Sequence, residues 1–189
     1  MIELVNIEKR FGNKRVLRNI NLNLQEGKVY GLFGPNGVGK TTLLKIMAGY
    51  NKKTSGEYKI NGLDFTYENK DHITFISDKE IFYGWMKIKD AVKYYKDFFT
   101  DFDEEKCLRL VKMMKLEADD KINVLSKGMK ARLKVALAIS RNAKLYLLDE
   151  PLGGLDPVSR KIILDTIKTL MNQNGILIIT SHLVNDVAD

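Results

Sequence analysis

The nine residues GPNGVGKTT, numbered 34–42, constrain this chain more than any other stretch of it. An apolar run, KVYGLF (28–33), leads into them, and TTLLKIMAG (41–49) follows with the apolar spacing of a helix. The residues that fit the pattern G-x-x-x-x-G-K-[ST] are Gly34, Gly39, Lys40 and Thr41. Glycines let successive backbone N–H groups turn toward phosphate oxygens, and the positive end of the following helix favours the same anion. The stretch therefore predicts a phosphate-binding loop between a strand and a helix.

The polar side chains of this loop predict a bound Mg-nucleotide. Lys40 is expected to reach the outer phosphates as a point charge, and the hydroxyl of Thr41 to bind Mg²⁺. Neither NKKT (51–54) nor NKDH (69–72) makes the Asn-Lys-x-Asp pattern that reads guanine, so ATP is expected rather than GTP. We expect the nucleotide to contact Gly34, Pro35, Asn36, Gly37, Gly39, Lys40, Thr41 and Thr42.

The composition is that of one globular domain without a membrane span. The chain has 189 residues, of which 44% are apolar and 29% charged. Its longest apolar runs cover only a few residues, whereas a transmembrane helix needs about 20. The N-terminus lacks the basic and apolar regions of a signal peptide, and the single cysteine, Cys107, fits a reducing compartment. We therefore expect a cytoplasmic protein.

The net charge of +7 does not by itself predict a nucleic-acid-binding face. The lysines are scattered along the chain, without a block of about five or six like charges. A solvated, lysine-rich surface explains this pattern, and no nucleic-acid partner is expected.

Apolar patterns predict an α/β fold with two kinds of strand. IELVNIEKRF (2–11) reads as a strand, VLRNINLNLQ (16–25) as a half-buried antiparallel strand, and SGEYKING (55–62) as a hairpin arm closed by an Asn-Gly turn. Short, nearly continuous apolar runs are typical of parallel strands covered on both faces; they are ITFIS (73–77), LYLLD (145–149) and ILIIT (176–180). These patterns predict a P-loop NTPase core with a mainly parallel sheet and an N-terminal antiparallel β-subdomain.

Between residues 81 and 142 only helical spacing occurs. The segments that carry it are KDAVKYYKDFF (89–99), EEKCLRLVKMMKL (104–116) and KGMKARLKVALAISRN (127–142). This indicates an all-helical subdomain inserted between two strands of the parallel core. We predict one domain over 1–189, with its core at 1–78 and 143–189 and the helical subdomain at about 79–142.

The stretch LYLLDEP (145–151) places two carboxylates at the end of a predicted strand. Asp149 is positioned to reach Mg²⁺. Glu150 follows on the opposite side of an extended chain and is the candidate to polarise an attacking water.

Other short motifs follow in a fixed order. LSKGMK (125–130) lies in the helical region, and in GGLDP (153–157) Asp156 and Pro157 predict the cap and first residue of a helix. Ser181-His182 directly follows ILIIT, and in parallel sheets ligands collect at the carboxyl ends of strands. His182 is therefore a candidate site residue.

In order and spacing, these motifs resemble the nucleotide-binding subunit of an ABC transporter, over essentially the whole chain. The resemblance implies that two subunits pair head to tail with ATP between them. It implies that Ser126 and Gly128 contact the γ-phosphate held by the other subunit. It also implies that Glu150 is the general base and that His182 holds the γ-phosphate and the attacking water.

The same resemblance suggests where the base of the nucleotide lies. Phe11, in KRFGNKRVL (9–17), matches the aromatic residue that stacks on adenine, and Val16 is expected to line the same pocket. An aromatic residue on a strand is more often part of the core, so Phe11 alone is weak evidence.

The chain departs from the family pattern within two motifs. Its signature has Lys127 and Met129 where a glycine and a glutamine are usual, but it keeps Gly128. Lys127 is expected to face solvent, the alternative being added positive charge near the phosphate. Gly153 stands where the D-loop usually has a serine.

Two further departures concern the metal and the end of the chain. After ITFIS the family usually has a glutamine that contacts Mg²⁺, and here the register gives Asp78. Asp78 is a third candidate metal ligand beside Thr41 and Asp149, although its reach is shorter and its contact with the ion stays open. The chain ends soon after His182, so we expect the C-terminal end of the usual domain to be missing.

The resemblance implies an ATPase that works in a transporter. The expected partners are a transmembrane permease subunit and, on ATP binding, an identical or closely related ATPase subunit. Binding to the permease would hold the chain on the inner face of the cell membrane. The SKGM signature resembles those of bacterial export and antibiotic-resistance subunits, so export is expected. The alternative is a soluble ABC ATPase of repair, translation or cluster assembly.

The segment EIFYGWMKI (80–88) is the expected permease dock. It crowds Phe82, Tyr83, Trp85 and Met86 together, which suits an apolar groove for a partner helix. We expect Tyr83 or Trp85 to be partly exposed in the isolated subunit.

Overall fold

The computed structural model describes residues 1–77, 79, 82–170 and 175–182. Within them the chain forms an antiparallel sheet of strand order β2-β1-β4-β5 and a parallel sheet of order β3-β8-β7-β6. The strands of the first sheet are β1 (Ile2–Phe11), β2 (Lys14–Leu24), β4 (Ser55–Ile60) and β5 (Leu63–Asp64). Those of the second are β3 (Val29–Phe33), β6 (Ile73–Ile76), β7 (Leu145–Leu148) and β8 (Ile176–Ser181). This is the predicted fold class.

Tight turns shape the antiparallel sheet. A turn at Gly12 and Asn13 joins β1 to β2, so that Phe11 and Lys14 lie directly opposite each other. The predicted hairpin between β4 and β5 turns at Asn61 and Gly62, whose φ angles of 51° and 78° are the left-handed values that an Asn-Gly pair supplies in a two-residue turn.

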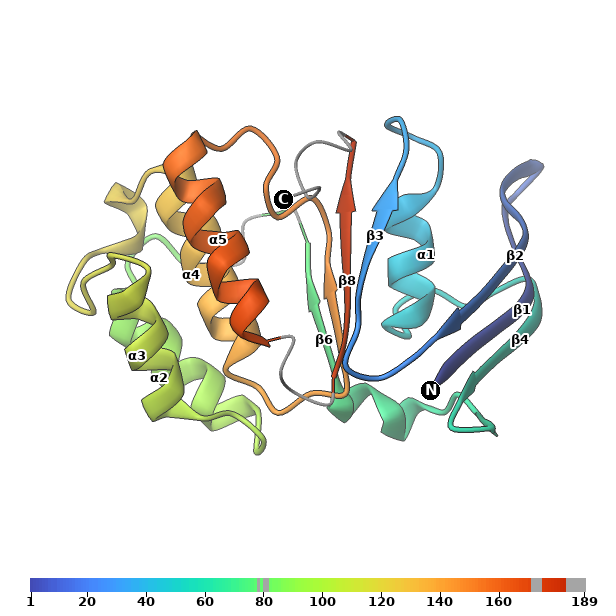
Figure 1. Cartoon of the computed structure of the whole chain (residues 1–189), viewed down its shortest axis with the longest axis horizontal. Coiled ribbons are helices and arrows are strands. Elements are labelled where there is room, and N and C mark those ends of the chain that lie inside the picture. Colours follow the sequence, from blue (N-terminus) through green and yellow to red (C-terminus); the bar gives the residue numbers. More distant parts are fainter. Residues whose placement is uncertain (78, 80–81, 171–174, 183–189) are drawn as a thin grey trace.

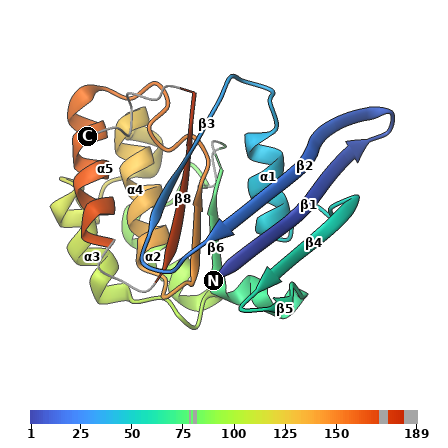
Figure 2. The same cartoon turned by 45° about the vertical axis from the view of Figure 1, so that its right-hand side comes forward.

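The helix α1 (Lys40–Met47) fills the space between the two sheets (Figures 1 and 2). Its residues Leu43, Leu44 and Met47 are buried in one cluster with apolar side chains of both sheets, among them Leu4 of β1 and Leu147 of β7. Because this apolar face is held from both sides, the start of α1 is fixed at the edge where β3 ends.

Helices cover the other face of the parallel sheet (Figure 1). Between β6 and β7 lie α2 (Ile88–Phe98), α3 (Glu104–Met113) and α4 (Lys127–Ile139), and α5 (Pro157–Leu170) follows β7. The short 3-10 helices are η1 (Tyr67–His72) and η2 (Ile122–Val124). The all-helical insert is thus in its predicted place, while the proposed subdomain boundaries stay a prediction.

No helix among the described residues combines the length and the apolar character that crossing a bilayer requires.

A buried arginine ties the helical insert to the parallel sheet. Arg141, just beyond α4, is 4% exposed. It donates from Nε to Oδ1 of Asp101 at 2.9 Å and from Nη1 to the carbonyl of Ile73, where β6 begins, at 3.0 Å. It also donates to the carbonyl of Asp71, and its guanidinium lies 4.0 Å from the ring centre of Phe99. Its planar fork therefore satisfies acceptors on both sides of this junction.

Replacing Arg141 by alanine should lower the free energy of unfolding by about 3 kcal/mol, because it leaves a half-buried carboxylate and two carbonyls without their donor. Denaturant unfolding measures this. The control is Arg109→Ala, since Arg109 pairs with Glu105 on the surface at 3.6 Å, with both side chains more than half exposed. That change should cost less than about 1 kcal/mol. Equal effects of the two substitutions would contradict the role of Arg141.

Candidate nucleotide-binding site

The loop between β3 and α1 needs glycine for steric reasons. Gly39, at the N-cap of α1, has φ of 114°, and a Cβ on it would lie 2.8 Å from Leu17 Cδ2 and 3.3 Å from the carbonyl oxygen of Val16. Gly37 also has a positive φ, of 80°. The backbone conformation therefore favours glycine at both positions, and the approach of β2 also excludes a side chain at Gly39.

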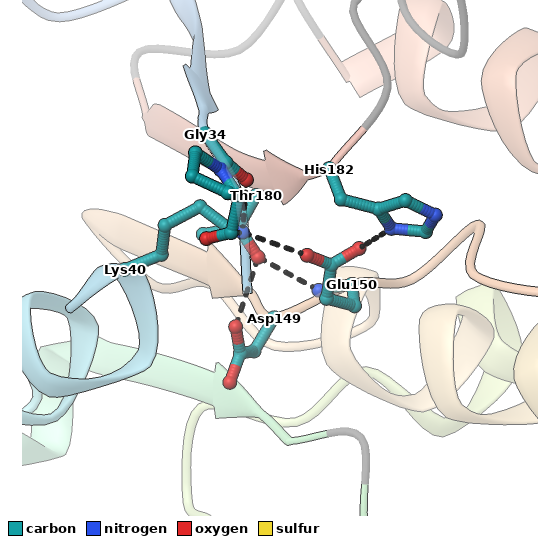
Figure 3. Close-up of polar contacts among 7 residues, drawn as sticks. Gly34, Lys40, Asp149, Glu150, Thr180 and His182 are labelled. Carbon is teal, nitrogen blue, oxygen red and sulfur yellow. Dashed lines mark hydrogen bonds and ion pairs between the residues drawn. The ribbon is translucent and has the colours of Figure 1, made fainter. Parts of the chain in front are cut away.

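Lys40 reaches from the first turn of α1 back across the loop. Its ammonium donates to the carbonyl oxygens of Gly34 at 2.6 Å and Pro35 at 3.3 Å. It also lies 3.3 Å from Oε1 of Glu150. That oxygen accepts no hydrogen bond from the residues that the structure describes, so the contact is an ion pair only. Figure 3 shows Lys40 and His182 on either side of the Glu150 carboxylate. The lysine is thus held by neutral carbonyls and one carboxylate.

Asp149 and Glu150 follow β7 and are joined by one hydroxyl. The hydroxyl of Thr180, on β8, donates to Oδ1 of Asp149 at 2.8 Å and accepts from the backbone N–H of Glu150 at 2.8 Å (Figure 3). Both Asp149 and Thr180 are buried. A polar side chain of the neighbouring strand therefore fixes both acidic residues at once.

The local backbone at Glu150 differs from the prediction. Sequence reasoning placed Asp149 and Glu150 on opposite sides of an extended chain, but β7 ends at Leu148 and Glu150 has a φ of 51°, in the left-handed region. The direction of its side chain therefore comes from a turn rather than from strand alternation. Its Oε2 lies 3.1 Å from Nδ1 of His182.

These groups surround a cavity of about 490 Å³ at the carboxyl edge of the parallel sheet. The described residues that line it are Lys14, Val16, Asn36, Gly37, Gly39, Lys40, Thr41, Thr42, Asp149 and Glu150. Of the predicted nucleotide contacts, Val16 and most of the loop are thus brought together. Gly34 and Pro35 are not among these lining residues, but their carbonyl oxygens accept hydrogen bonds from the ammonium of Lys40.

The end of the site at which the adenine base is expected is less enclosed than the phosphate-binding loop. Phe11 lies at the tip of the hairpin, 49% exposed and outside the set of lining residues, with Nζ of Lys9 at 4.6 Å from its ring centre. The exposed ring of Phe11 leaves room for a base to stack on it, although the ammonium of Lys9 already covers part of the ring.

The oxygen donors at the cavity fit Mg²⁺. Thr41, which carries a hydroxyl, and Asp149, which carries a carboxylate, both line this cavity, and the second carboxylate oxygen of Asp149, Oδ2, is not engaged by Thr180. Mg²⁺ characteristically takes only one or two protein oxygens and completes its shell with phosphate and water. The third predicted ligand, Asp78, lies outside the described residues.

The signature residues lie away from the nucleotide cavity of their own chain. Ser126 is exposed and caps α4, its hydroxyl accepting from the N–H of Met129 at 3.2 Å. Gly128 is buried, and a Cβ there would lie 2.4 Å from the hydroxyl oxygen of Ser159. Close packing of α4 on the start of α5 is therefore a reason for this glycine that the sequence did not suggest.

The turn that follows β7 borders a second cavity, of about 650 Å³. Lys127 and His182 line it. Asn36, Asp149 and Glu150 line both cavities. Lys127 is exposed, as expected, but its ammonium lies against Gly154, where a Cβ would be 2.6 Å from Nζ. His182 thus adjoins the nucleotide cavity rather than lining it.

The predicted start of α5 is confirmed. Pro157 is its first residue, and Oδ1 of Asp156 accepts from the N–H of Ser159 at 2.9 Å. Hydrogen bonds from the side chain and backbone of Ser159 lower the pKa of Asp156.

Sequence reasoning missed two residues of the site. Thr180 was read only as part of an apolar strand, and its position between Asp149 and Glu150 depends on the pairing of β7 with β8. Lys14 was read as one of many scattered surface lysines. Its closeness to Phe11 across a tight turn was the available signal.

Comparison with known proteins identifies the family of the chain. The family described as "ABC transporter" matches residues 17–153. The chain is 32% identical over 189 residues to the lantibiotic transport ATP-binding protein SrtF of Streptococcus pyogenes, covering 99% of this chain and 82% of that protein. It is 34% identical over 190 residues to the spermidine/putrescine import ATP-binding protein PotA of Mesoplasma florum, covering 96% of this chain but 54% of that protein.

Among solved structures, the fold is similar to the ATP-binding cassette MJ0796 in a dimeric post-hydrolysis state bound to ADP and phosphate. The TM-score is 0.85 at 26% identity, and the match covers 99% of this chain and 90% of that one. The predicted family and fold are thereby confirmed.

Thr180→Val should lower the free energy of unfolding by about 2 kcal/mol, because it leaves Asp149 Oδ1 and the Glu150 N–H without their hydrogen-bond partner. Valine has nearly the same shape as threonine, so the substitution removes the hydroxyl with little change in packing. Thr180→Ser keeps the hydroxyl and should cost about 1 kcal/mol for the lost methyl group. Thermal unfolding and Mg-ATP titration compare the two. If the Thr180→Val variant binds Mg-ATP as tightly as the Thr180→Ser variant, the hydroxyl does not position Asp149 and Glu150.

Proposed function

The chain belongs to the ABC transporter family, and from that premise we propose that it binds and hydrolyses Mg-ATP in a head-to-tail dimer and so drives export through a separate membrane permease. The observation that carries the proposal is the convergence of Lys40, Glu150 and His182 at one edge of the sheet. A lysine, a carboxylate and an imidazole that meet beside a glycine loop suit the cleavage of a terminal phosphate.

The contacts of Lys40 suggest how nucleotide binding would prepare the site. Lys40 is held by two carbonyl groups and by Glu150. Phosphate oxygens carry more charge than carbonyl groups, so a bound triphosphate attracts the ammonium more strongly. Lys40 then pairs with phosphate, and Glu150 is released to accept a proton from water.

The residues around Glu150 have separate roles in this proposal. The turn at Glu150 and its bond to Thr180 fix the carboxylate, and His182 at 3.1 Å orients it and the water beside it. Thr41 and Asp149 would hold Mg²⁺, which would neutralise charge on the phosphates during transfer. Because Asp149 is buried and bonded, its carboxylate is preorganised for that task.

Dimerisation completes the site. Ser126 is exposed at the start of α4, where the helix dipole favours an anion, yet it does not line its own chain's nucleotide cavity. We infer that Ser126 of each subunit binds the γ-phosphate held by the other, with Gly128 setting the approach of α4 to α5. The positive loops would repel each other without nucleotide, so pairing depends on ATP.

The direction of transport and the location of the chain follow from the whole assembly. The SKGM signature and the likeness to a lantibiotic transport protein favour export, and the likeness to a polyamine import protein is the reason to test it. We infer that the chain lies on the cytoplasmic face of the membrane, held there by its permease. Transport in inverted vesicles distinguishes the two directions.

Glu150→Gln should retain Mg-ATP binding while single-turnover hydrolysis falls by about 10²–10⁴-fold, the usual contribution of a general base. Removal of one negative charge next to the triphosphate should also trap the dimer, which light scattering detects with Mg-ATP and not without it. Asp149→Asn should instead weaken Mg-ATP binding and never form that dimer.

Two results would count against these assignments. Hydrolysis by Glu150→Gln near the parent rate would move the role of base to another residue, with His182 examined first. A dimer of the same arrangement in nucleotide-free buffer would exclude ATP as the cause of pairing.

An aromatic pair next to α2 is the proposed permease dock. Tyr83 and Trp85 are 61% and 70% exposed, with ring centres 6.1 Å apart and planes 15° from parallel. The exposure expected from the sequence is confirmed, whereas Met86 is buried and belongs to the core. Two large rings stacked in solvent offer an anchor for an amphipathic helix of the permease.

Changing both Tyr83 and Trp85 to alanine should abolish co-purification with the multi-span membrane protein that the parent chain retains, while ATPase activity of the free subunit stays within about twofold. The matched control changes Tyr94 and Phe98, an exposed pair on α2 with ring centres 4.4 Å apart. If only the control pair weakens association, the dock lies on α2. If the parent retains no membrane protein, the soluble alternative gains support.

A further inference from the structure

We propose that Lys14 binds the nucleotide through the phosphate group nearest the ribose. The proposal rests on the function above, since it requires that the cavity beside Lys40 holds ATP. Within the described part of the chain, Lys14 and Lys40 are the cationic side chains that line this cavity. They come from different elements, β2 and the start of α1, and so reach it from different parts of the fold.

The register of the first hairpin places Lys14 at the base end of the cavity. Lys14 lies directly opposite Phe11 across the turn, and such cross-strand partners have neighbouring side chains on one face of a sheet. Val16, at a shift in the register of β2 between Arg15 and Leu17, lines the cavity as well. Lys14 therefore lies across the turn from Phe11 and shares the cavity lining with Val16.

The side chain of Lys14 also differs from those of Arg15 and Lys9. Arg15, on the opposite face, pairs with Glu8 at 3.3 Å, and Lys9 donates to the carbonyl of Lys52 at 2.7 Å and lies over Phe11. The ammonium of Lys14 makes no hydrogen bond or ion pair with any residue that the structure describes. An unpaired ammonium beside a phosphate-binding loop is suited to an anionic ligand.

The order of groups along a nucleotide selects which phosphate Lys14 contacts. Lys40 and Glu150 mark the end at which the terminal phosphate is cleaved, and Phe11 marks the base. A cation next to Phe11 is thus near the ribose, and the first negative charge within its reach is the α-phosphate. ADP and ATP share that group, so Lys14 should affect their binding alike.

The test measures Mg-ATP and Mg-ADP affinity by calorimetry for Lys14→Gln, Lys14→Arg and Arg15→Gln. We expect Lys14→Gln to weaken both nucleotides by roughly three- to tenfold, the size of one exposed charge contact, with a smaller dependence on salt than the parent. Lys14→Arg should stay close to the parent. Arg15→Gln removes the same charge from the opposite face of the same strand and should leave affinity unchanged.

Further outcomes separate the possible failures. Affinity of Lys14→Gln within twofold of the parent, or an equal loss in Arg15→Gln, would overturn the role of Lys14. A loss for ATP with none for ADP would place the contact on the γ-phosphate and also overturn it. Lys40→Ala serves as the reference: if it binds both nucleotides like the parent, the proposed site itself is wrong.

Discussion

The site depends on the parallel pairing of β3, β8 and β7. Parallel strands all end at the same edge of the sheet, so the segments that follow them meet there although they are far apart in the chain. In this chain those segments are the glycine loop, the pair Asp149-Glu150, and His182. A one-residue slip of β8 against β7 would turn Thr180 away from both acidic residues and into the opposite face. Register therefore sets the chemistry as well as the fold.

The second constraint is electrostatic. Lys40 and Glu150 lie 3.3 Å apart, with the lysine side chain 7% and the glutamate side chain 22% exposed. Each would be a costly isolated charge at that depth, so each serves as the other's counter-ion. In the proposed function a bound triphosphate would displace the carboxylate from the ammonium and so free the proposed base. One ion pair would then link binding to hydrolysis.

Local sequence predicted most of the fold and the residues that a motif fixes, because these depend on short-range rules. The glycine loop, the cap at Asp156 and the Asn61-Gly62 turn need only neighbours in sequence. Thr180 could not be predicted, since its role arises from strand register, and neither could the left-handed φ of Glu150, which ends the alternation that was assumed. Gly128 was assigned for phosphate binding, whereas its packing against Ser159 appears only once α4 and α5 are placed.

This last case shows how one residue can meet two demands. The approach of α4 to α5 at Gly128 fixes the start of α4, and with it Ser126, relative to the turn that holds Glu150. A larger side chain at 128 would have to move Ser159 or α4 itself, shifting Ser126 with them. The position of the signature is therefore coupled to the position of Glu150, the proposed general base, on the same subunit. In the proposed head-to-tail dimer these two groups would serve different nucleotides, so packing inside one chain would connect the two sites.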